Sequence, residues 1–345
     1  MNKEGVMTMI KVGIVGFGFM GRMHYRCWNE FAGAKVVAVC DADPDIVSKT
    51  GSAGGNIDGA AGKIDLSDFE LFSDFDRMLA EGNLDVVSVT LPSHLHKAFT
   101  IKALNAGVHV FCEKPMALSV EQCSEMIAAA EQSGKLLQIG HCIRFWPEYA
   151  KTKEIIDSGQ YGKVVAATFQ RLGAPPSWGD NWFANDELSG GMAMDLHIHD
   201  SDFVQYLFGM PASVCSAAAG NADGAMSCIA SRYEYDDGKL VTAEGSWAMS
   251  PSFGFEMSFN IVMEKATILF DCTRDPSFKV CPFDGEVSTP EVAAGDGYSR
   301  ELEHFAGLVN GKKMPEVITL EQSLNSIQLV LAEIESAKTG QRVTI

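Results

Sequence analysis

The sequence predicts an α/β chain with two parts: a doubly wound parallel sheet in residues 1–140, and an α+β domain with a mostly antiparallel open sheet in residues 141–345. In the first part, short apolar runs alternate with helical patterns, which is typical of parallel strands covered by helices on both faces. In the second part, several strand-like runs follow one another without helices between them. A chain of 345 residues also makes two domains the default expectation.

Local signals place the elements of the first part. Apolar runs bounded by turn residues predict strands at 12–16, 36–40, 85–90, 108–112 and 136–140. Helices are expected at about 20–29, from a capping box at Ser73-x-x-Asp76, from Pro92 to about Asn105, and from Ser119 to Gly134. The Gly/Ala-rich stretch 51–62 is predicted to be a mobile loop, longer than usual.

In the second part, several strands follow one another without helices between them. Helices are expected at about 148–157, 195–208, 299–309 and 320–339, and a long strand at 163–172. The polar turn 236–239 joins two strand-like runs as a hairpin, and 261–271 reads as a second hairpin. These elements indicate a mostly antiparallel sheet with helices on one face.

A glycine motif, Gly16-x-Gly18-x-x-Gly21, follows the first predicted strand and opens a helix. Gly16 permits the tight turn, Gly18 keeps the backbone bare for a phosphate, and Gly21 lets the helix pack close to the sheet. The first helical turn, with Phe19 and Met20, then directs its N–H groups at an anion. This context predicts a dinucleotide-binding domain, whereas the alternative is a Gly-rich turn in an unrelated α/β protein.

An acidic residue selects the dinucleotide. Asp41 ends the second predicted strand, twenty residues beyond the last glycine of the motif. Its carboxylate can accept both hydroxyls of the adenosine ribose and would repel a 2′-phosphate. Neither Ala42 nor Asp43 supplies an arginine that would reverse this preference. The sequence therefore favours NAD over NADP.

Composition excludes several classes of protein. A net charge of −18 argues against nucleic acid and anionic lipid as partners, and no apolar run reaches 18 residues. Gly13, Gly16 and Gly18 interrupt the first apolar run, which favours a strand over a secretory signal. The nine cysteines include no C-x-x-C pair, so they predict buried thiols in the reducing cytoplasm rather than a zinc or redox site.

Two predicted strand ends carry candidate cofactor residues, because ligands of open parallel sheets bind beyond the carboxyl ends of the strands. Leu91, Pro92 and His96 follow one strand, and Glu113 and Lys114 follow the next. Lys114 is placed where a nicotinamide ring should lie and can donate a hydrogen bond to a substrate oxygen. The alternative for Lys114 is a solvated loop lysine beside a turn proline.

A second cluster of polar residues lies on the helix expected at 195–208. Asp195 and His199 are four residues apart and share a helical face, so the carboxylate can hold the imidazole as a general base. His197 points elsewhere and is expected to be structural. Asp200 and Asp202 are expected to be surface or subunit-contact charges. The histidine spacing does not favour a metal site.

Together these motifs resemble the Gfo/Idh/MocA oxidoreductase family, and the similarity covers nearly the whole chain. The matching segments are the glycine motif with Asp41, Pro92 with His96, AGVHVFCEKP, GHCIRFWP, GGMAMDLHIHD and the ending ESAKTGQRVTI. The resemblance implies a Rossmann domain that binds NAD(P), followed by an α/β domain whose open sheet commonly forms subunit contacts. It also implies a cis peptide between Lys114 and Pro115.

The resemblance implies a catalytic trio at Lys114, Asp195 and His199. In the expected mechanism, a secondary alcohol of a sugar, polyol or inositol-like cyclitol gives a hydride to NAD while His199 takes the hydroxyl proton. Asp195 stabilises the imidazolium, and Lys114 hydrogen-bonds the reacting oxygen. The alternatives are an NAD-dependent glycoside hydrolase that acts by transient oxidation and a non-catalytic NAD- or sugar-sensing regulator.

The substrate pocket is less well specified by the sequence. Its candidate residues are Arg144, Arg171, Trp178, Asn181 and Trp182, since an aromatic face suits the C–H face of a sugar. Polyols, cyclitols and aldose sugars are the expected substrates. A homodimer or homotetramer in the cytoplasm is the expected assembly.

Overall fold

The structure is a computed structural model that describes residues 9–43, 45–46, 64, 69–176, 182–220 and 225–345. The expected loop at 51–62, Trp178 and Asn181 lie outside these residues. Within this range the chain forms two compact units, and each is described separately below. One unit comprises Met1–Cys142, Ser177–Trp182 and Gly297–Leu320; the other comprises Ile143–Pro176, Phe183–Asp296 and Glu321–Ile345.

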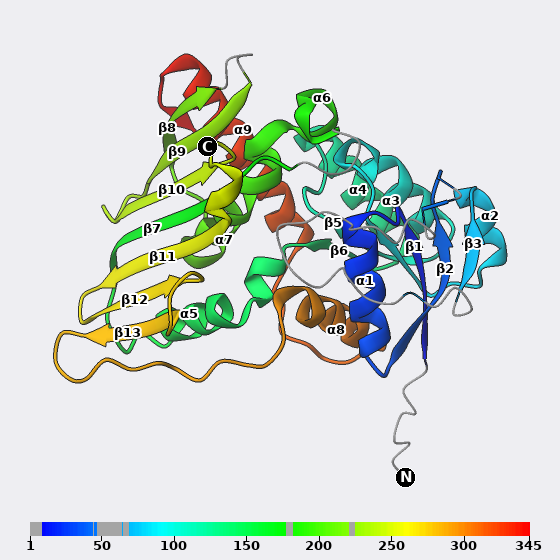
Figure 1. The fold of residues 1–345 in the computed structure, drawn as a ribbon, viewed down its shortest axis with the longest axis horizontal. Coiled ribbons are helices and arrows are strands. Elements are labelled where there is room, and N and C mark those ends of the chain that lie inside the picture. The colour runs from blue at the N-terminus through cyan, green and yellow to red at the C-terminus, as the bar shows by residue number, and fades with distance from the viewer. Residues whose placement is uncertain (1–8, 44, 47–63, 65–68, 177–181, 221–224) are drawn as a thin grey trace, which may run out of the picture. The chain divides into compact units, whose positions relative to one another are not determined.

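A six-stranded parallel sheet forms the centre of the first unit, in the order β3-β2-β1-β4-β5-β6 (Figure 1). The strands are β1 (Ile10–Val15), β2 (Ala34–Cys40), β3 (Glu70–Phe72), β4 (Val86–Val89), β5 (His109–Glu113) and β6 (Leu137–Gly140). This order reverses direction between β1 and β4, as in dinucleotide-binding folds, so the loops after these strands meet at the switch point. The predicted Rossmann-type sheet is confirmed.

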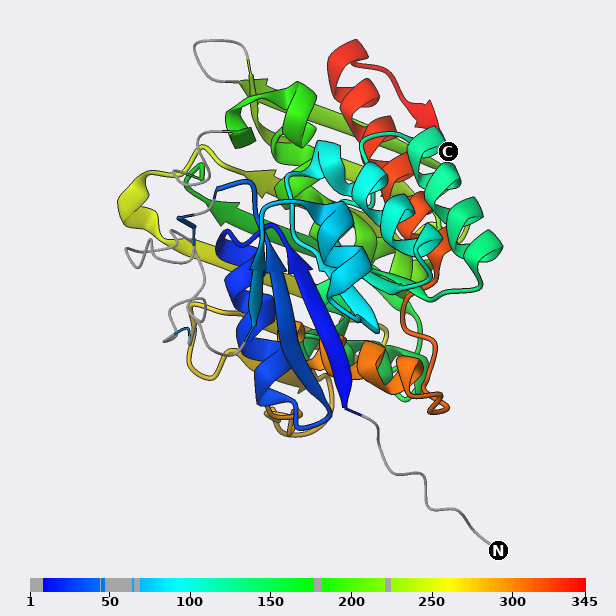
Figure 2. The same cartoon turned by 90° about the vertical axis from the view of Figure 1, so that its right-hand side faces the viewer.

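Helices cover this sheet. They are α1 (Phe19–Glu30), α2 (Phe75–Glu81), α3 (His96–Asn105), α4 (Val120–Ser133) and α8 (Gly297–Val309), with a 3₁₀ turn at Ser93–Leu95. On one face, the Phe111 ring packs 5.4 Å from His24 of α1 and 5.6 Å from Phe305 of α8. On the other face, α3 packs against β5 and against α4 (Figure 2). A division at residue 140 alone therefore omits α8, which returns late in the chain to complete this layer.

Capping explains two helix starts, one of them differently from the sequence prediction. The Ser119 side chain accepts a hydrogen bond from the Gln122 N–H at 3.3 Å, which confirms the predicted cap of α4. The predicted cap at Ser73 is wrong, because Asp74 accepts from the Arg77 N–H at 2.8 Å and α2 begins one residue later. Asp and Ser are comparable N-caps, so their order along the chain did not distinguish them.

The second unit contains an eight-stranded sheet in the order β13-β12-β11-β7-β10-β9-β8-β14. Its strands are β7 (Val164–Gly173), β8 (Ser213–Gly220), β9 (Met226–Glu234), β10 (Leu240–Ser246), β11 (Phe255–Met263), β12 (Ala266–Asp271), β13 (Phe278–Pro282) and β14 (Val343–Thr344). Neighbours pair antiparallel except β7 and β10, which are parallel. The predicted mostly antiparallel sheet is confirmed.

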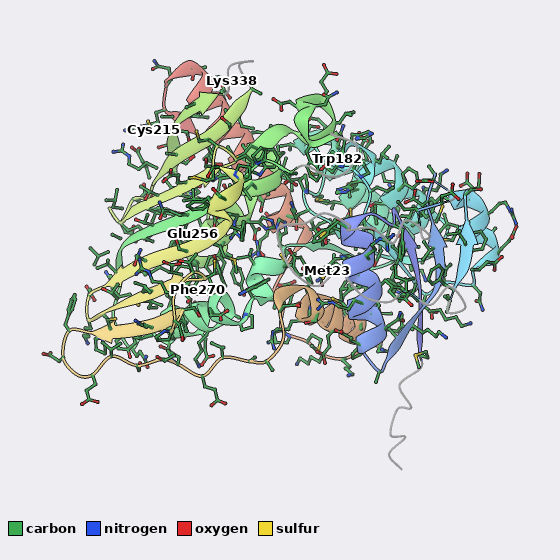
Figure 3. All side chains as sticks on the ribbon, in the orientation of Figure 1. Met23, Trp182, Cys215, Glu256, Phe270 and Lys338 are labelled. Carbon is green, nitrogen blue, oxygen red and sulfur yellow. The ribbon has the colours of Figure 1, made fainter. Side chains whose placement is uncertain are left out.

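Helices cover one face of this second sheet (Figure 1). They include α5 (Pro147–Asp157), α7 (Ile198–Phe208) and α9 (Leu320–Thr339), and α6 (Asp186–Ser189) is a single turn. The Tyr149 ring lies 4.8 Å from Phe203 and 5.0 Å from Phe259, so α5, α7 and β11 share one aromatic core. Phe270 of β12, labelled in Figure 3, extends this core at 5.3 Å from Tyr149.

The opposite face of the second sheet is open. Side chains that alternate with the core positions, such as Thr168, Asn260 and Arg232, are exposed there. Of the nine cysteines, all free, five are buried, whereas Cys272 and Cys215 are exposed. Cys215, on β8, is labelled in Figure 3. The prediction of buried thiols is therefore correct for five of the nine cysteines only.

Candidate functional site

The glycine loop after β1 combines two locked positions with one open position. Gly16 has φ +86°, and a Cβ there would lie 2.8 Å from the Thr90 carbonyl oxygen. A Cβ at Gly21 would collide with the carbonyl oxygen of Gly16. At Gly18, in contrast, a Cβ would have no atom of the described residues within 4 Å. The backbone at Gly18 is therefore bare and accessible, which is what a pyrophosphate requires.

Helix α1 begins at this open position. Gly18 is its N-cap and supplies no side-chain cap, and the first turn, with Phe19 and Met20, contains no acidic residue. The leading N–H groups of a helix have no partners within the helix, and their dipoles favour an anion. The glycine cradle and the uncapped turn therefore fit the pyrophosphate of NAD.

Asp41 and Thr90 hold the loop in place. Asp41 accepts hydrogen bonds from the Phe17 N–H at 2.7 Å and from the Asp43 N–H at 2.9 Å, one on each carboxylate oxygen. The Thr90 hydroxyl lies 2.6 Å from the Gly16 carbonyl oxygen. A carboxylate has about four acceptor sites, so Asp41 keeps capacity for ribose hydroxyls. Sequence reasoning missed Thr90, for which no motif gives a signal.

His96 joins the two candidate loops at the ends of β4 and β5. Its Nδ1 lies 2.7 Å from the Pro115 carbonyl oxygen, and its Nε2 lies 2.8 Å from the Leu91 carbonyl oxygen. A neutral imidazole donates from one ring nitrogen only, whereas an imidazolium donates from both. Burial lowers the pKa of His96 and so disfavours the imidazolium. The side chain is 1% exposed and both nitrogens face protein carbonyls. His96 therefore holds the loops together, and the prediction of direct cofactor contact by this residue is not supported.

Glu113 lies buried beneath the loop that presents Lys114. Its Oε1 is 2.9 Å from Nε2 of His24, and its Oε2 accepts from the Lys114 N–H at 3.2 Å. Burial raises the pKa of Glu113, but the hydrogen bond and charge of His24, with the charge of Lys114, outweigh it and lower the pKa overall. Glu113 thus positions the Lys114 backbone, and its contact with the cofactor stays a prediction. The Lys114–Pro115 peptide bond is cis, as the resemblance implies.

Asp195 lies in a π-helical turn, and His199 lies in the first turn of α7, which follows it directly. Ala193–His197 form the π turn, and the Ile198 N–H donates to the Ala193 carbonyl five residues back. Asp195 and His199 are half-buried, whereas every other residue from Gly191 to Asp200 is buried. The π turn and the first turn of α7 therefore leave a carboxylate and an imidazole partly exposed. His197 is fully buried, in agreement with its expected structural role.

The two arginines predicted to line the substrate pocket are buried in ion pairs. Arg144, 1% exposed, donates to both oxygens of Asp202 at 2.9 and 2.7 Å. Arg171, 2% exposed, donates to both oxygens of Asp200 at 2.8 and 3.1 Å. Burial raises the pKa of Asp200, although the charge of Arg171 opposes this. The prediction that Asp200 and Asp202 are surface charges is therefore wrong, and a substrate role for either arginine is not supported.

The remaining predicted residues are described only in part. Leu91 and Pro92 lie directly after β4, where the sequence placed them, and Trp182 is half-buried in a 3₁₀ turn. Among the described residues, no group of three or more His, Cys, Asp or Glu side chains is arranged to hold a metal ion. No helix in the described part of the chain has the length and hydropathy to cross a membrane.

Comparison with known families identifies both halves of the chain. Residues 10–141 match a family model described as "Oxidoreductase family, NAD-binding Rossmann fold". Residues 149–269 match the model of the GFO/IDH/MocA C-terminal domain. The two models follow one another along the chain in the same order as the two sheets.

Individual relatives align over almost the full chain. D-glucoside 3-dehydrogenase of Escherichia coli is 29% identical, with 97% of each chain covered. The NAD⁺-dependent scyllo-inositol 2-dehydrogenase of Bacillus subtilis is 26% identical, with 97% of this chain and 96% of the relative covered. The crystal structure of the WlbA dehydrogenase from Bordetella pertussis, in complex with NADH and UDP-GlcNAcA, shares the fold with a TM-score of 0.81, 24% identity and 98% of each chain covered.

Proposed function

Since the chain belongs to the GFO/IDH/MocA oxidoreductase family and carries its NAD-binding Rossmann domain, we propose that it transfers a hydride between NAD and a secondary alcohol of a sugar, polyol or cyclitol. The observation that carries this proposal is the segment of the π turn and the start of α7, where only Asp195 and His199 are not buried between Gly191 and Asp200. A carboxylate and an imidazole that are both partly exposed, four residues apart, are suited to general acid–base catalysis.

Bound NAD supplies a nicotinamide ring that accepts the hydride. In the oxidation direction, His199 takes the hydroxyl proton of the substrate, and Asp195 stabilises the imidazolium that forms. Lys114 donates a hydrogen bond to the same oxygen and stabilises its developing negative charge. Glu113 and His96 act through Lys114: one holds its backbone N–H, and the other holds the loop that follows it.

The preference for NAD rests on Asp41. Its carboxylate is anchored at the end of β2 by two backbone N–H groups, so its position beside the glycine loop is defined. An NADP phosphate at the ribose 2′ position would face this negative charge, whereas the ribose hydroxyls of NAD can donate to it. NAD is therefore the cofactor of the proposed reaction.

Ring alcohols are the substrate class best supported by the relatives. Two proteins that align over 97% of this chain are named for a glucoside and for scyllo-inositol. Both names describe six-membered rings that carry secondary hydroxyl groups. We therefore place cyclic polyols and sugars ahead of open-chain alcohols.

We propose that the protein works in the cytoplasm as a homodimer or homotetramer. The open face of the second sheet is the proposed subunit contact. The exposed Thr168, Asn260 and Arg232 lie on that face. Light scattering coupled to gel filtration measures the mass. A monomer with a single-chain mass of 37.3 kDa would contradict the assembly.

A panel of inositols, aldoses, glucosides and polyols, each with NAD or NADP, tests the reaction through absorbance of the reduced cofactor. Steady accumulation of NADH with one substrate supports the dehydrogenase. Cleavage of a glycoside without net NADH would instead indicate transient oxidation with recycling of the cofactor. Binding of NAD and sugar without turnover of any compound would indicate a regulator.

A further inference from the structure

A buried polar cluster lies behind the π turn, and the proposed reaction does not use it. His197 of the turn, Ser201 of α7, Tyr233 of β9 and Glu333 of α9 are each at most 1% exposed. The Ser201 hydroxyl lies 3.1 and 3.0 Å from the two carboxyl oxygens of Glu333 and 3.4 Å from the Tyr233 hydroxyl. Four elements of the second unit therefore meet at one carboxyl group.

Close packing, more than hydrogen bonding, holds His197 in this cluster. Its Nε2 lies 3.4 Å from Oε2 of Glu333, and neither ring nitrogen has a hydrogen-bond partner among the described residues. On the other side, a Cβ at Gly245 of β10 would lie 2.9 Å from both Cβ and Nδ1 of His197. The imidazole is therefore wedged between β10 and α9.

Burial favours the uncharged form of both Glu333 and His197. Burial raises the pKa of Glu333 to about 8, because Tyr233 and Ser201 only partly offset the loss of water and Asp200 adds to the rise. Burial also lowers the pKa of His197 to about 3, with the charge of Arg171 acting in the same direction. A charged pair at this depth would lose more hydration than its attraction returns, so a carboxylic acid beside a neutral imidazole is favoured.

We propose that Glu333 and His197 are positioning residues, a buried pair that holds the π turn and so orients Asp195 and His199 toward the substrate. His197 lies between these two residues in the chain, so its ring fixes the rotation of the turn. Ser201 anchors the same turn, since its hydroxyl also lies 3.3 Å from the His197 carbonyl oxygen. This inference rests on the proposed function only for the roles of Asp195 and His199.

The protonated acid can be tested without turnover. Infrared spectra at about pH 7 should show a protonated carboxyl band that Glu333→Gln removes, because the amide keeps the shape and neutrality of the acid but lacks the acid's carbonyl stretch. The difference spectrum separates Glu333 from Asp200. The matched control is Glu335→Gln, an exposed carboxylate on the same helix, which should remove no such band. An unchanged band in Glu333→Gln overturns the proposal.

The stability of the folded chain gives a second readout. A carboxyl whose pKa is raised to about 8 in the folded state binds more protons there than in the unfolded state. The folded protein therefore loses stability as the pH rises toward that value. His197 contributes a slope only below its ordinary pKa of 6.5. Between about pH 6.5 and about pH 8, the urea midpoint should therefore fall in the native protein and stay flatter in Glu333→Gln. Equal slopes would count against the inference.

Positioning is tested by kinetics and by NMR. In the native protein, turnover of the substrate identified by the panel should decline above about pH 8 as Glu333 ionises, and Glu333→Gln should lose this decline while keeping turnover at neutral pH. Gly245→Ala should displace His197 and lower kcat about 10- to 100-fold with unchanged NAD affinity. If no compound turns over, the ring-nitrogen resonances of His199 still report its orientation, and a titration unchanged by Gly245→Ala overturns the positioning role.

Discussion

The glycine loop and the π turn are both built to present polar groups, but they are held in different ways. The loop presents backbone N–H groups, and its shape follows from Gly16, Gly18 and Gly21. The π turn and the start of α7 present the side chains of Asp195 and His199, and their supports come from α9, β9 and β10. The glycine loop is therefore shaped mainly by its own motif, with Asp41 and Thr90 as more distant supports, whereas placement of the acid–base pair depends on several elements of the second unit.

Removal of the proposed base should give the largest effect and separate the π-turn site from the glycine loop most clearly. His199→Ala should lower kcat about 10²- to 10⁴-fold, because proton transfer then relies on water. NAD binding, measured by calorimetry, should stay within about twofold, since the glycine loop belongs to the other unit. Lys114→Ala should also lower kcat, because it removes the hydrogen bond to the reacting oxygen, although Lys114 belongs to the same unit as the glycine loop. Parallel loss of binding and turnover in either variant would show that the two sites are not separable in this way.

The buried ion pairs of the second unit give the next largest effect. Arg144→Met should lower the free energy of unfolding by about 3–5 kcal/mol, because it leaves the Asp202 carboxylate buried without its guanidinium. Urea denaturation measures this loss. The double variant Arg144→Met with Asp202→Leu should recover part of it, and a single variant as stable as the native protein would imply that the pair is hydrated.

Two substitutions within the glycine loop sharpen the comparison further. Gly18→Ala should leave the melting temperature unchanged, since its Cβ enters open space, but weaken NAD binding about tenfold or more by blocking the pyrophosphate. Gly21→Ala should instead lower stability by about 1–3 kcal/mol, because its Cβ meets the Gly16 carbonyl. Thermal melts and calorimetry separate these outcomes. Equal destabilisation by both substitutions would argue against an open position at Gly18.

The smallest effect concerns helix capping in the first unit. Ser119→Ala should destabilise the protein by about 1 kcal/mol through loss of the cap on α4. Ser73→Ala, the matched control, should change stability by less than about 0.5 kcal/mol because Asp74 is the cap. Both are read from urea midpoints, and a larger loss at Ser73 would restore the sequence-based assignment.

Much of the fold could be predicted because its signals are local. The helix expected at 320–339 is found at Leu320–Thr339, and the strand expected at 108–112 is found at His109–Glu113. Short elements gave no such signal: β3 has three residues and β14 has two, which is too few for an apolar period. The π turn was also missed, because its extra residue per turn leaves Asp195 and His199 on one side, as an α-helix would.

The residues of the candidate site show the same difference between those with a local sequence signal and those without one. The glycine motif and the EKP segment lie next to what they organise, and Asp41 ends a strand at a characteristic distance from the motif, so their spacing was informative. Arg144 and Arg171 looked like pocket residues, because a guanidinium that meets a buried carboxylate 58 or 29 residues away carries no local mark of that pairing. Glu333 gave no signal at all, since it lies 132 residues from Ser201.

The sequence by itself determined the kind of sheet, the glycine cradle and the family to which the chain belongs, because backbone conformation and hydrophobic period depend on near neighbours. Only the tertiary structure decided which charged groups are exposed and which are buried and paired. The physical reason is that the ionisation and role of a side chain depend on its hydration and on partners from distant segments. Asp195 and Asp200 illustrate this: they lie five residues apart, yet one is half-buried and the other is enclosed with Arg171.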